Sequence, residues 1–200
     1  MELFDFAPSG NCHKICLFLS LLQVPYQPVP IDVVNLQQKS EPFLMMNPFG
    51  QLPVLKDGET VVWDSQAILL YLARKYAAPS WLPLDAVGMS RVMEWLSTAA
   101  NEVARGPSSL RVYHKFGRAI AMEDALQATA SVLPILEQQL KAGDWLAARH
   151  ITIADIAIYP YIALAPEGKI DLTPYPAICQ WICRIQALPN YVGMPNMWSS

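Results

Sequence analysis

The sequence predicts an α+β N-terminal domain over residues 1–77, a linker over 78–87 and an all-α domain over 88–200. In the first part, short apolar runs typical of strands alternate with segments whose apolar residues recur every three or four positions, as on one helix face. In the last part almost every segment has the helical spacing. The stretch between them holds two prolines and no periodicity, which indicates a linker.

The first predicted elements form a β-α-β unit. Glu2–Phe6 is a short apolar run ended by a proline and a glycine, the pattern of a strand that enters a loop. The next segment has the spacing of one helix face, with Cys12, Ile15, Cys16, Leu19 and Leu22. Tyr26–Val33 is predicted to be extended, and Pro28 and Pro30 place it at a sheet edge because proline cannot donate to the ladder. Strands joined through a helix should run parallel.

A hairpin and a helix complete the predicted N-terminal domain. Pro53–Lys56 and Thr60–Trp63 flank Asp57-Gly58, and Asp-Gly between two β-rich runs is the strongest short-range hairpin signal. A helix then starts at Asp64-Ser65 with Ile68, Leu69, Leu72 and Tyr76 on one side. After a connection, the order is therefore β-β-α. A four-stranded mixed sheet flanked by helices is the compact solution.

The C-terminal part is predicted to be helical throughout. Its expected helices are Met89–Val103, interrupted at Gly106-Pro107 and resumed to Phe116, then Met122–Leu140 with a bend at Pro134, Thr152–Leu164 and Tyr175–Leu188.

The composition excludes several classes of protein. The 200 residues are 53% apolar and only 16% charged, which excludes a disordered chain. A net charge of −3 offers no basic surface for nucleic acid or for an anionic membrane. Four cysteines are too few for a disulfide scaffold.

No segment is predicted to span a membrane. The most apolar stretch, Ile156–Pro166, is broken by Pro160 and is shorter than the roughly 20 residues of a spanning helix. Ile15–Leu22 has the length of a signal-peptide core, but Glu2 and Asp5 precede it and no cleavage site follows. We therefore expect a soluble protein in the reducing cytoplasm.

The first motif that carries chemistry is Ser9–Lys14, at the start of the first helix. Helix N-termini present unbonded N–H groups and a partial positive charge, so a hydroxyl or an amide there can hold a thiolate. Cys12 at such a position would itself have a lowered pKa. The alternative is that Ser9 or Asn11 only caps the helix.

The second motif is Asn47–Pro53. A proline that enters a strand after a glycine-containing turn suggests a cis peptide bond at Leu52-Pro53. The backbone of Leu52 would then be turned away from the sheet and could pair with an extended peptide. The alternative is an ordinary turn.

The third motif, Asp64-Ser65, begins a helix. A hydroxyl, a backbone N–H and the helix dipole make a small carboxylate site, and the aspartate can take an ammonium group. Such a site suits the end of an amino acid, although a simple helix cap explains the same residues. A fourth motif, Thr152–Asp155, is a capping box, to which we assign a structural role only.

The cysteine pairs do not predict a metal site. Cys12 and Cys16, and likewise Cys179 and Cys183, are four residues apart, whereas zinc sites typically have two residues between their cysteines. Cysteine also packs well as a small core residue. We therefore expect no metal.

Together, Ser9–Lys14, Asn47–Pro53, Asp64–Ile68 and Thr152–Asp155 resemble the motifs of the glutathione S-transferase family in order and spacing. The first three match its thioredoxin-like N-terminal domain, and the fourth matches a capping box in its helical C-terminal domain. The resemblance covers nearly the whole chain. It implies a thioredoxin-like β-α-β-α-β-β-α domain followed by an all-α domain.

The resemblance also implies residue roles. The family binds the tripeptide glutathione on the N-terminal domain, and Ser9 matches the serine that donates a hydrogen bond to its sulfur. Leu52, before a cis Pro53, matches the residue whose backbone pairs with the cysteinyl unit. Asp64 and Ser65 match the acidic–serine pair that holds the γ-glutamyl end, with an aspartate one methylene shorter than the usual glutamate.

Other positions match less closely. Gln51 and Lys39 correspond to residues near the glycyl or γ-glutamyl ends of glutathione. Some bacterial relatives use a cysteine near the start of the first helix and others use an asparagine. Cys12 and Asn11 are therefore rivals of Ser9 for the contact with the sulfur.

The resemblance also implies a second-substrate pocket against the helical domain. The residues that lie where the family collects this pocket are Trp95, Arg105, Leu110, Tyr113 and Phe116, although aromatic residues at helical spacing also make ordinary core. Among them, Arg105 could meet an anionic group of the substrate, and Tyr113 could line the pocket.

The expected chemistry is activation of a thiol. A free thiol has a pKa of about 8.5, and lowering it by about two units requires about 2.7 kcal/mol, within reach of one charge-assisted hydrogen bond and a helix dipole. The serine would act as a donor, because no Ser–His–Asp signature supports a nucleophilic serine.

The leading expectation is a cytoplasmic, homodimeric glutathione transferase that adds the thiolate to a hydrophobic electrophile. Alternatives are a glutathione-dependent disulfide reductase that uses Cys12 or bound glutathione, and a non-catalytic protein on the same fold.

Overall fold

The computed structural model describes residues 1–199 and contains a four-stranded sheet in the order β2-β1-β3-β4. The strands are β1 (Glu2–Asp5), β2 (Gln27–Pro30), β3 (Val54–Asp57) and β4 (Thr60–Trp63). β1 runs parallel to β2 and antiparallel to β3, which pairs antiparallel with β4. The predicted mixed sheet is confirmed, and the strand with two prolines lies at an edge, as its missing N–H donors require.

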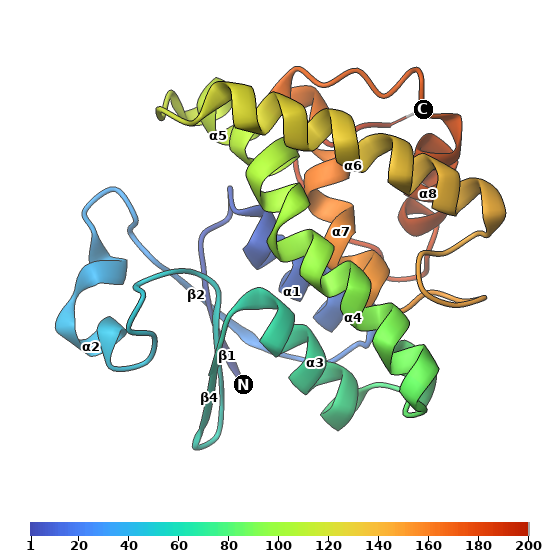
Figure 1. Ribbon diagram of the computed structural model, residues 1–200. Coiled ribbons are helices and arrows are strands. Elements are labelled where there is room, and N and C mark those ends of the chain that lie inside the picture. Colours follow the sequence, from blue (N-terminus) through green and yellow to red (C-terminus); the bar gives the residue numbers. More distant parts are fainter. Residues whose placement is uncertain (200) are drawn as a thin grey trace.

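Helices cover both faces of this sheet. They are α1 (Gly10–Leu21), the 3-10 helix η1 (Gln37–Lys39), α2 (Glu41–Leu44) and α3 (Ser65–Tyr76). In Figure 1, α1 and α3 lie on one side of the sheet and α2 on the other. Alternate strand residues serve the two faces, since Leu3 and Leu55 belong to the main core while Val54 packs with Phe43 of α2. The order β-α-β-α-β-β-α is confirmed.

The rest of the chain is helical, as predicted. Its helices are α4 (Ala86–Ala100), α5 (Ser109–Phe116), α6 (Met122–Ala142), α7 (Ile153–Ala163) and α8 (Pro176–Gln186), with the 3-10 helices η2 (Pro79–Trp81) and η4 (Ala165–Gly168) and the π-helix η3 (Ala104–Ser108). Every residue of α7 is buried. This helix packs against α1, α3 and α4 and so joins the helical part to the sheet-containing part (Figure 1).

Two expected boundaries differ from the structure. The break predicted at Gly106-Pro107 is instead η3, which leads directly into α5, and the helix is interrupted earlier, at Asn101, the C-cap of α4. A π-helical turn accommodates Pro107 because it changes the bonding pattern where the proline has no N–H, and the hydroxyl of Ser109 donates to the carbonyl oxygen of Ala104 at 3.0 Å. α4 begins three residues before the predicted Met89, since the side chain of Asp85 caps it by accepting from Gly88 N at 2.9 Å.

The predicted capping box anchors α7. The Asp155 carboxylate is fully buried and accepts hydrogen bonds from the backbone N–H groups of Thr152 and Leu146 at 2.9 and 3.0 Å and from the indole of Trp181 at 3.0 Å. Burial raises the pKa of Asp155 to about 6, although these hydrogen bonds oppose the rise. The motif therefore joins three separate segments, which confirms its structural role.

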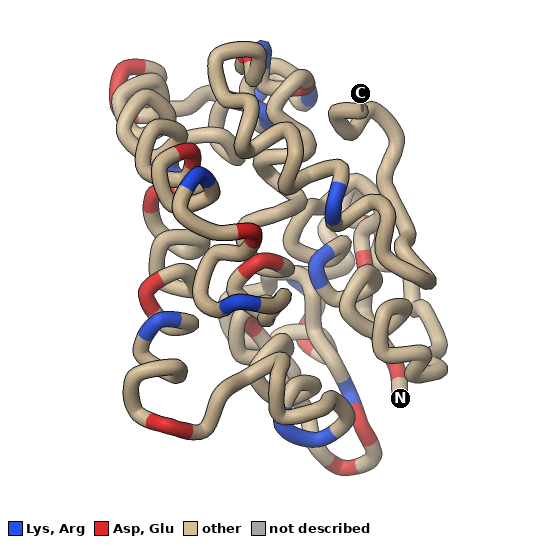
Figure 2. Tube along the Cα trace, turned by 90° about the vertical axis from the view of Figure 1, so that its right-hand side faces the viewer, with Lys and Arg blue, Asp and Glu red and all other residues tan. Residues whose placement is uncertain are grey.

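Charged residues are scattered over the molecule. Figure 2 shows Lys and Arg spread among Asp and Glu rather than gathered on one face. Among residues 1–199, no helix combines the length and the apolar composition needed to cross a bilayer.

Candidate active site

Three predicted segments meet at one edge of the sheet. Phe4, next to the last residue of β1, pairs with Val54 at the start of β3, and Val54 pairs with Trp63 at the end of β4. The chain segments next to these residues must therefore leave the sheet at the same edge. They are the loop to Ser9, Leu52-Pro53 and Asp64-Ser65.

Ser9 is the N-cap of α1. Its Oγ accepts a hydrogen bond from Cys12 N at 3.3 Å, and its hydroxyl proton has no acceptor among residues 1–199. The N-terminus of α1 fits closely under α7, because a Cβ on Gly10 would lie 2.8 Å from the ring of Tyr161. Ser9 therefore caps the helix and at the same time keeps a free donor, so the two interpretations of this motif are compatible.

Cys12 lies beneath the same helical turn. It is 1% exposed, and burial raises the pKa of its thiol, an effect that the nearby Ser9 hydroxyl only partly offsets. A buried thiol with a raised pKa stays protonated at neutral pH and is a poor nucleophile.

The peptide bond between Leu52 and Pro53 is cis, as the sequence predicts. The backbone of Leu52 makes no hydrogen bond to another described residue. A hydrogen bond fixes the loop before Leu52, because the side-chain amide of Asn47 donates to Gln51 O at 2.9 Å. Leu52 therefore offers a backbone that an extended peptide can pair with.

Asp64 and Ser65 form the start of α3. One carboxylate oxygen of Asp64, Oδ1, accepts from Gln66 N at 2.9 Å and from Ala67 N at 3.2 Å. Its second oxygen has no hydrogen-bond partner within the described chain. The Ser65 hydroxyl donates to Gln66 Oε1 at 2.6 Å. The aspartate is a helix cap in the free protein and retains an acceptor for a ligand.

Lys39 is the last residue of η1, Gln51 lies in the loop that precedes Leu52, and both are exposed. The Lys39 ammonium donates to Phe49 O at 2.8 Å, and a Cβ on Gly50 would approach Lys39 Nζ to 2.9 Å. Gly50 has a φ of +56°, a conformation that glycine adopts without strain. Lys39 is thus fixed against the turn that leads to Gln51.

Sequence reasoning gave no role to Lys14, which the structure places under the site. The side chain is 1% exposed, and its Nζ donates to Asn11 Oδ1 at 2.8 Å and to Gln66 Oε1 at 3.5 Å. The ammonium also lies 5.5 Å from the centre of the Tyr161 ring. No sequence signal separates a buried lysine from an exposed one within a helix, because only the packing of α3 and α7 buries it.

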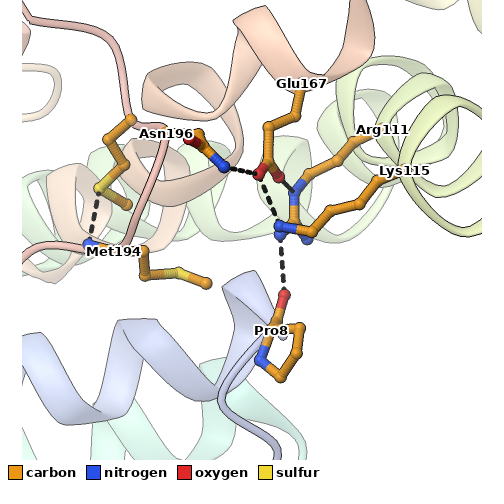
Figure 3. A network of polar contacts seen from close by, with 7 residues as sticks. Pro8, Arg111, Lys115, Glu167, Met194 and Asn196 are labelled. Atoms are coloured by element: carbon orange, nitrogen blue, oxygen red, sulfur yellow. Dashed lines mark hydrogen bonds and ion pairs between the residues drawn. The ribbon is translucent and has the colours of Figure 1, made fainter.

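Arg111 was also missed, and it holds the loop that presents Ser9. The side chain is buried, its Nη2 donates to Pro8 O at 2.8 Å, and its Nε pairs with Glu167 at 2.5 Å (Figure 3). Lys115 and Asn196 donate to the other Glu167 oxygen. Although burial opposes it, these hydrogen bonds hold the pKa of Glu167 below its usual range. The helical part thereby fixes the carbonyl one residue before Ser9.

Arg105 and Tyr113 lie on η3 and α5, and both are exposed. The Arg105 side chain has no hydrogen bond or ion pair with the described residues, and the ring of Tyr113 contacts that of His114 edge to face, with the ring centres 4.9 Å apart. A cavity of about 320 Å³ between α5 and α6 is lined by neither of them. A role for these two residues in binding a second substrate stays a prediction.

The cysteines and acids do not gather into a metal site. Within residues 1–199, no group of three or more His, Cys, Asp or Glu side chains is placed to hold a metal ion. Cys12, Cys16, Cys179 and Cys183 are all free.

Comparison with known proteins gives the family. Residues 1–74 match the family model of the glutathione S-transferase N-terminal domain, and residues 92–189 match that of the C-terminal domain. These matches confirm the thioredoxin-like domain followed by a helical domain.

Relatives cover the chain almost from end to end. The disulfide-bond oxidoreductase YfcG of Escherichia coli is 31% identical over 92% of this chain and 89% of its own. Glutathione S-transferase theta-1 of Rattus norvegicus is 32% identical over 94% of this chain and 82% of its own.

Solved structures agree. A glutathione S-transferase from Pseudomonas fluorescens has a TM-score of 0.89 at 31% identity and covers 97% of this chain and 98% of its own. A glutathione transferase homologue from Drosophila mojavensis, solved with bound glutathione, has a TM-score of 0.85 at 29% identity and covers 94% of this chain and 88% of its own. On the domain matches and these relatives, the chain belongs to the glutathione S-transferase family.

Proposed function

We propose that this protein is a glutathione transferase, which binds glutathione along the sheet edge and directs its thiolate at an electrophilic carbon of a hydrophobic small molecule. The observation that carries the proposal is the convergence of three complementary groups at one edge. They are a free hydroxyl donor at a helix N-terminus, an unbonded backbone, and a second helix start with a carboxylate and a hydroxyl.

Each group suits one part of the tripeptide. Leu52 would pair with the peptide backbone of the cysteinyl unit. At the γ-glutamyl end, Ser65 and the N-terminus of α3 would take the carboxylate and Asp64 the ammonium group. Lys39 and Gln51 border the same edge and would reach a terminal carboxylate. A structurally similar homologue was solved with bound glutathione, which supports the choice of glutathione as the ligand.

The proposed reaction needs a thiolate. The bound thiol loses its proton to solvent, and the resulting thiolate forms a bond from sulfur to the electrophilic carbon. A leaving group departs with its electron pair, or in an addition the adjacent atom takes up a proton. Ser9 stabilises the thiolate by donating a hydrogen bond, and the N-terminus of α1 adds its partial positive charge. The burial of Cys12 favours Ser9 over it for this role, while Asn11 stays a possible second donor.

The test is to measure binding of glutathione by calorimetry and its conjugation to an activated aryl chloride. The proposal predicts both. If glutathione binds but no electrophile is conjugated, a non-catalytic protein on the same fold is the better interpretation, and the absence of binding would refute the proposal altogether.

A second candidate is glutathione-dependent reduction of disulfides. Similarity at 31% identity to a protein named a disulfide-bond oxidoreductase favours it. Since Cys12 is buried, the attacking thiolate would be that of bound glutathione, which would form a mixed disulfide and release a thiol. Comparing turnover of an aryl chloride with turnover of a small soluble disulfide separates the two candidates.

Within the chain, we propose residues 78–87 as the linker between the domains, and we propose the cytoplasm as the location of the protein. We also propose that the protein is a homodimer. Phe49 and Trp63 are 60% and 40% exposed, and their rings lie 5.3 Å apart on the surface. Met45, at 83% exposure, belongs to the loop that precedes Phe49. Such exposed apolar side chains are typical of a surface that another chain covers. Light scattering of the wild-type protein should give twice the mass of one chain. Phe49→Asp should lower the measured mass to that of a single chain.

A further inference from the structure

Lys14 is an unusual residue for the interior because no carboxylate pairs with it. Within residues 1–199 it takes part in no ion pair at salt-bridge distance, and its polar contacts are the two amide oxygens of Asn11 and Gln66. Three elements surround its ammonium: α1, which carries Asn11, α3, which carries Gln66 and is capped by Asp64, and α7, which carries Tyr161. The carboxylate of Asp64 attracts the Lys14 ammonium over a distance longer than that of an ion pair.

The chemistry of an ammonium fixes the orientation of both amides. A lysine ammonium has only donors, so the oxygens of Asn11 and Gln66 face Lys14. In a planar amide the NH₂ group lies on the other side of the carbonyl carbon from the oxygen. Both NH₂ groups therefore face away from the buried ammonium, and neither has a hydrogen-bond acceptor among the described residues.

The two amides belong to the two helix starts that form the site. Asn11 is in the first turn of α1, two residues after Ser9. Gln66 follows Ser65 and accepts its hydroxyl at 2.6 Å. When a bound carboxylate takes that hydroxyl, Lys14 remains as the donor that keeps the Gln66 oxygen turned inward.

We propose that Lys14 is a positioning residue of the glutathione site, holding the NH₂ group of Asn11 toward the sulfur and that of Gln66 toward the γ-glutamyl carboxylate. This inference rests on the proposed binding of glutathione. It links the two ends of the ligand through one buried cation, so that each amide is a preorganised donor rather than a freely rotating group.

Burial of the cation supports a functional role. Burial lowers the pKa of Lys14 to about 7, and the negative charge of Asp64 offsets this only in part. An apolar side chain of the same length would fill the space without that cost. The γ-glutamyl carboxylate and the thiolate bring negative charge near the ammonium, so ligand binding should favour the protonated lysine.

The first experiment compares Lys14→Met with the wild-type protein. Calorimetry gives the affinity for glutathione, and the ultraviolet absorbance of the thiolate gives the pKa of the bound thiol. We expect affinity to fall about 10- to 100-fold, as for groups that orient a ligand-binding residue, and the thiol pKa to rise by about one unit. The thermal midpoint should stay equal or rise. Lys141→Met, which removes a lysine that is exposed on α6, should change neither binding property.

A second experiment tests whether Lys14 acts through Asn11. In an Asn11→Ala background, Lys14→Met should add little to the rise in thiol pKa. Full additivity of the two changes would overturn the positioning role.

A third readout is proton uptake. S-methylglutathione has no ionisable thiol, so calorimetry near neutral pH in two buffers of different ionisation enthalpy reports protons taken up by the protein. We expect uptake in the wild type and its loss in Lys14→Met. Equal affinity, thiol pKa and proton uptake in both proteins would overturn the inference while leaving glutathione binding intact. If the wild type binds no glutathione, both the inference and the proposed function fail.

Discussion

Replacing Ser9 by alanine should raise the pKa of the bound glutathione thiol. The Ser9 hydroxyl already accepts from Cys12 N at 3.3 Å, so its proton is free to point at a sulfur. Ser9→Ala removes that donor and leaves the backbone N–H groups of the α1 N-terminus in place. The variant therefore isolates the hydroxyl from the helix.

The size of the effect follows from the kind of hydrogen bond. A hydrogen bond to a charged acceptor contributes about 1.5–3 kcal/mol, which corresponds to about one to two pKa units. The helix N-terminus retains its own contribution of about 0.3–1 kcal/mol. At a pH well below the pKa of the bound thiol, Ser9→Ala should conjugate about 10- to 100-fold more slowly than the wild type. This difference in rate between the two proteins should narrow as the pH rises above about 8.5, where the free thiol also ionises.

The assay is the pH dependence of kcat/KM with an activated aryl chloride as the electrophile. Ser9→Thr keeps the hydroxyl and should keep the wild-type profile, whereas Ser9→Ala should shift the profile to higher pH. Loss of the N-cap also lowers the free energy of unfolding by about 1 kcal/mol, which thermal unfolding measures separately. An unshifted profile in Ser9→Ala would refute the assignment of Ser9 and favour Asn11.

Four further changes have distinct outcomes. Cys12→Ala should keep most of the turnover, since the thiol is buried and protonated, and loss of activity in a folded variant would restore it as a catalytic candidate. Arg111→Leu should cost about 1.5–3 kcal/mol in chemical denaturation, because the buried Glu167 carboxylate keeps Lys115 but loses its hydrogen bond from Arg111, and the Pro8 carbonyl loses its donor; a change under 1 kcal/mol would contradict this. Asp155→Ala should lower the free energy of unfolding by about 3 kcal/mol or more, as several buried donors lose their acceptor; an unchanged thermal midpoint would argue against the network. Lys14 has a pKa lowered to about 7 from 10.5, so the folded state binds fewer protons than the unfolded chain between these values. Any gain in the free energy of unfolding from Lys14→Met should be largest below pH 7 and shrink as the pH approaches 10.5. A gain that does not change with pH would show that the lowered pKa of Lys14 is not its cause.

Features set by local chemistry could be predicted from the sequence. The Asp57-Gly58 hairpin follows from the need for a positive φ, and Gly58 has a φ of +60°. The edge position of β2 follows from the missing N–H groups of its prolines. The capping box of α7 depends on residues three positions apart. In each case the residues that predict the feature lie within a few positions of the feature in the sequence.

Features set by packing between distant segments could not be predicted. Lys14 is a lysine in a helix, and only the approach of Gln66 and Tyr161 buries it. The contact of Arg111 with Pro8 joins residues 103 positions apart in sequence. The burial of Cys12 depends on the same packing, which is why its position at a helix start suggested a reactive thiol and the structure gives an inert environment.

The most direct measurement is a crystal structure of the protein with glutathione. The account predicts an extended tripeptide along the sheet edge, its backbone paired with Leu52, its γ-glutamyl end at Asp64 and Ser65, and its sulfur about 3 Å from Ser9 Oγ. A sulfur that lies against Cys12, or a ligand bound elsewhere on the chain, would contradict it.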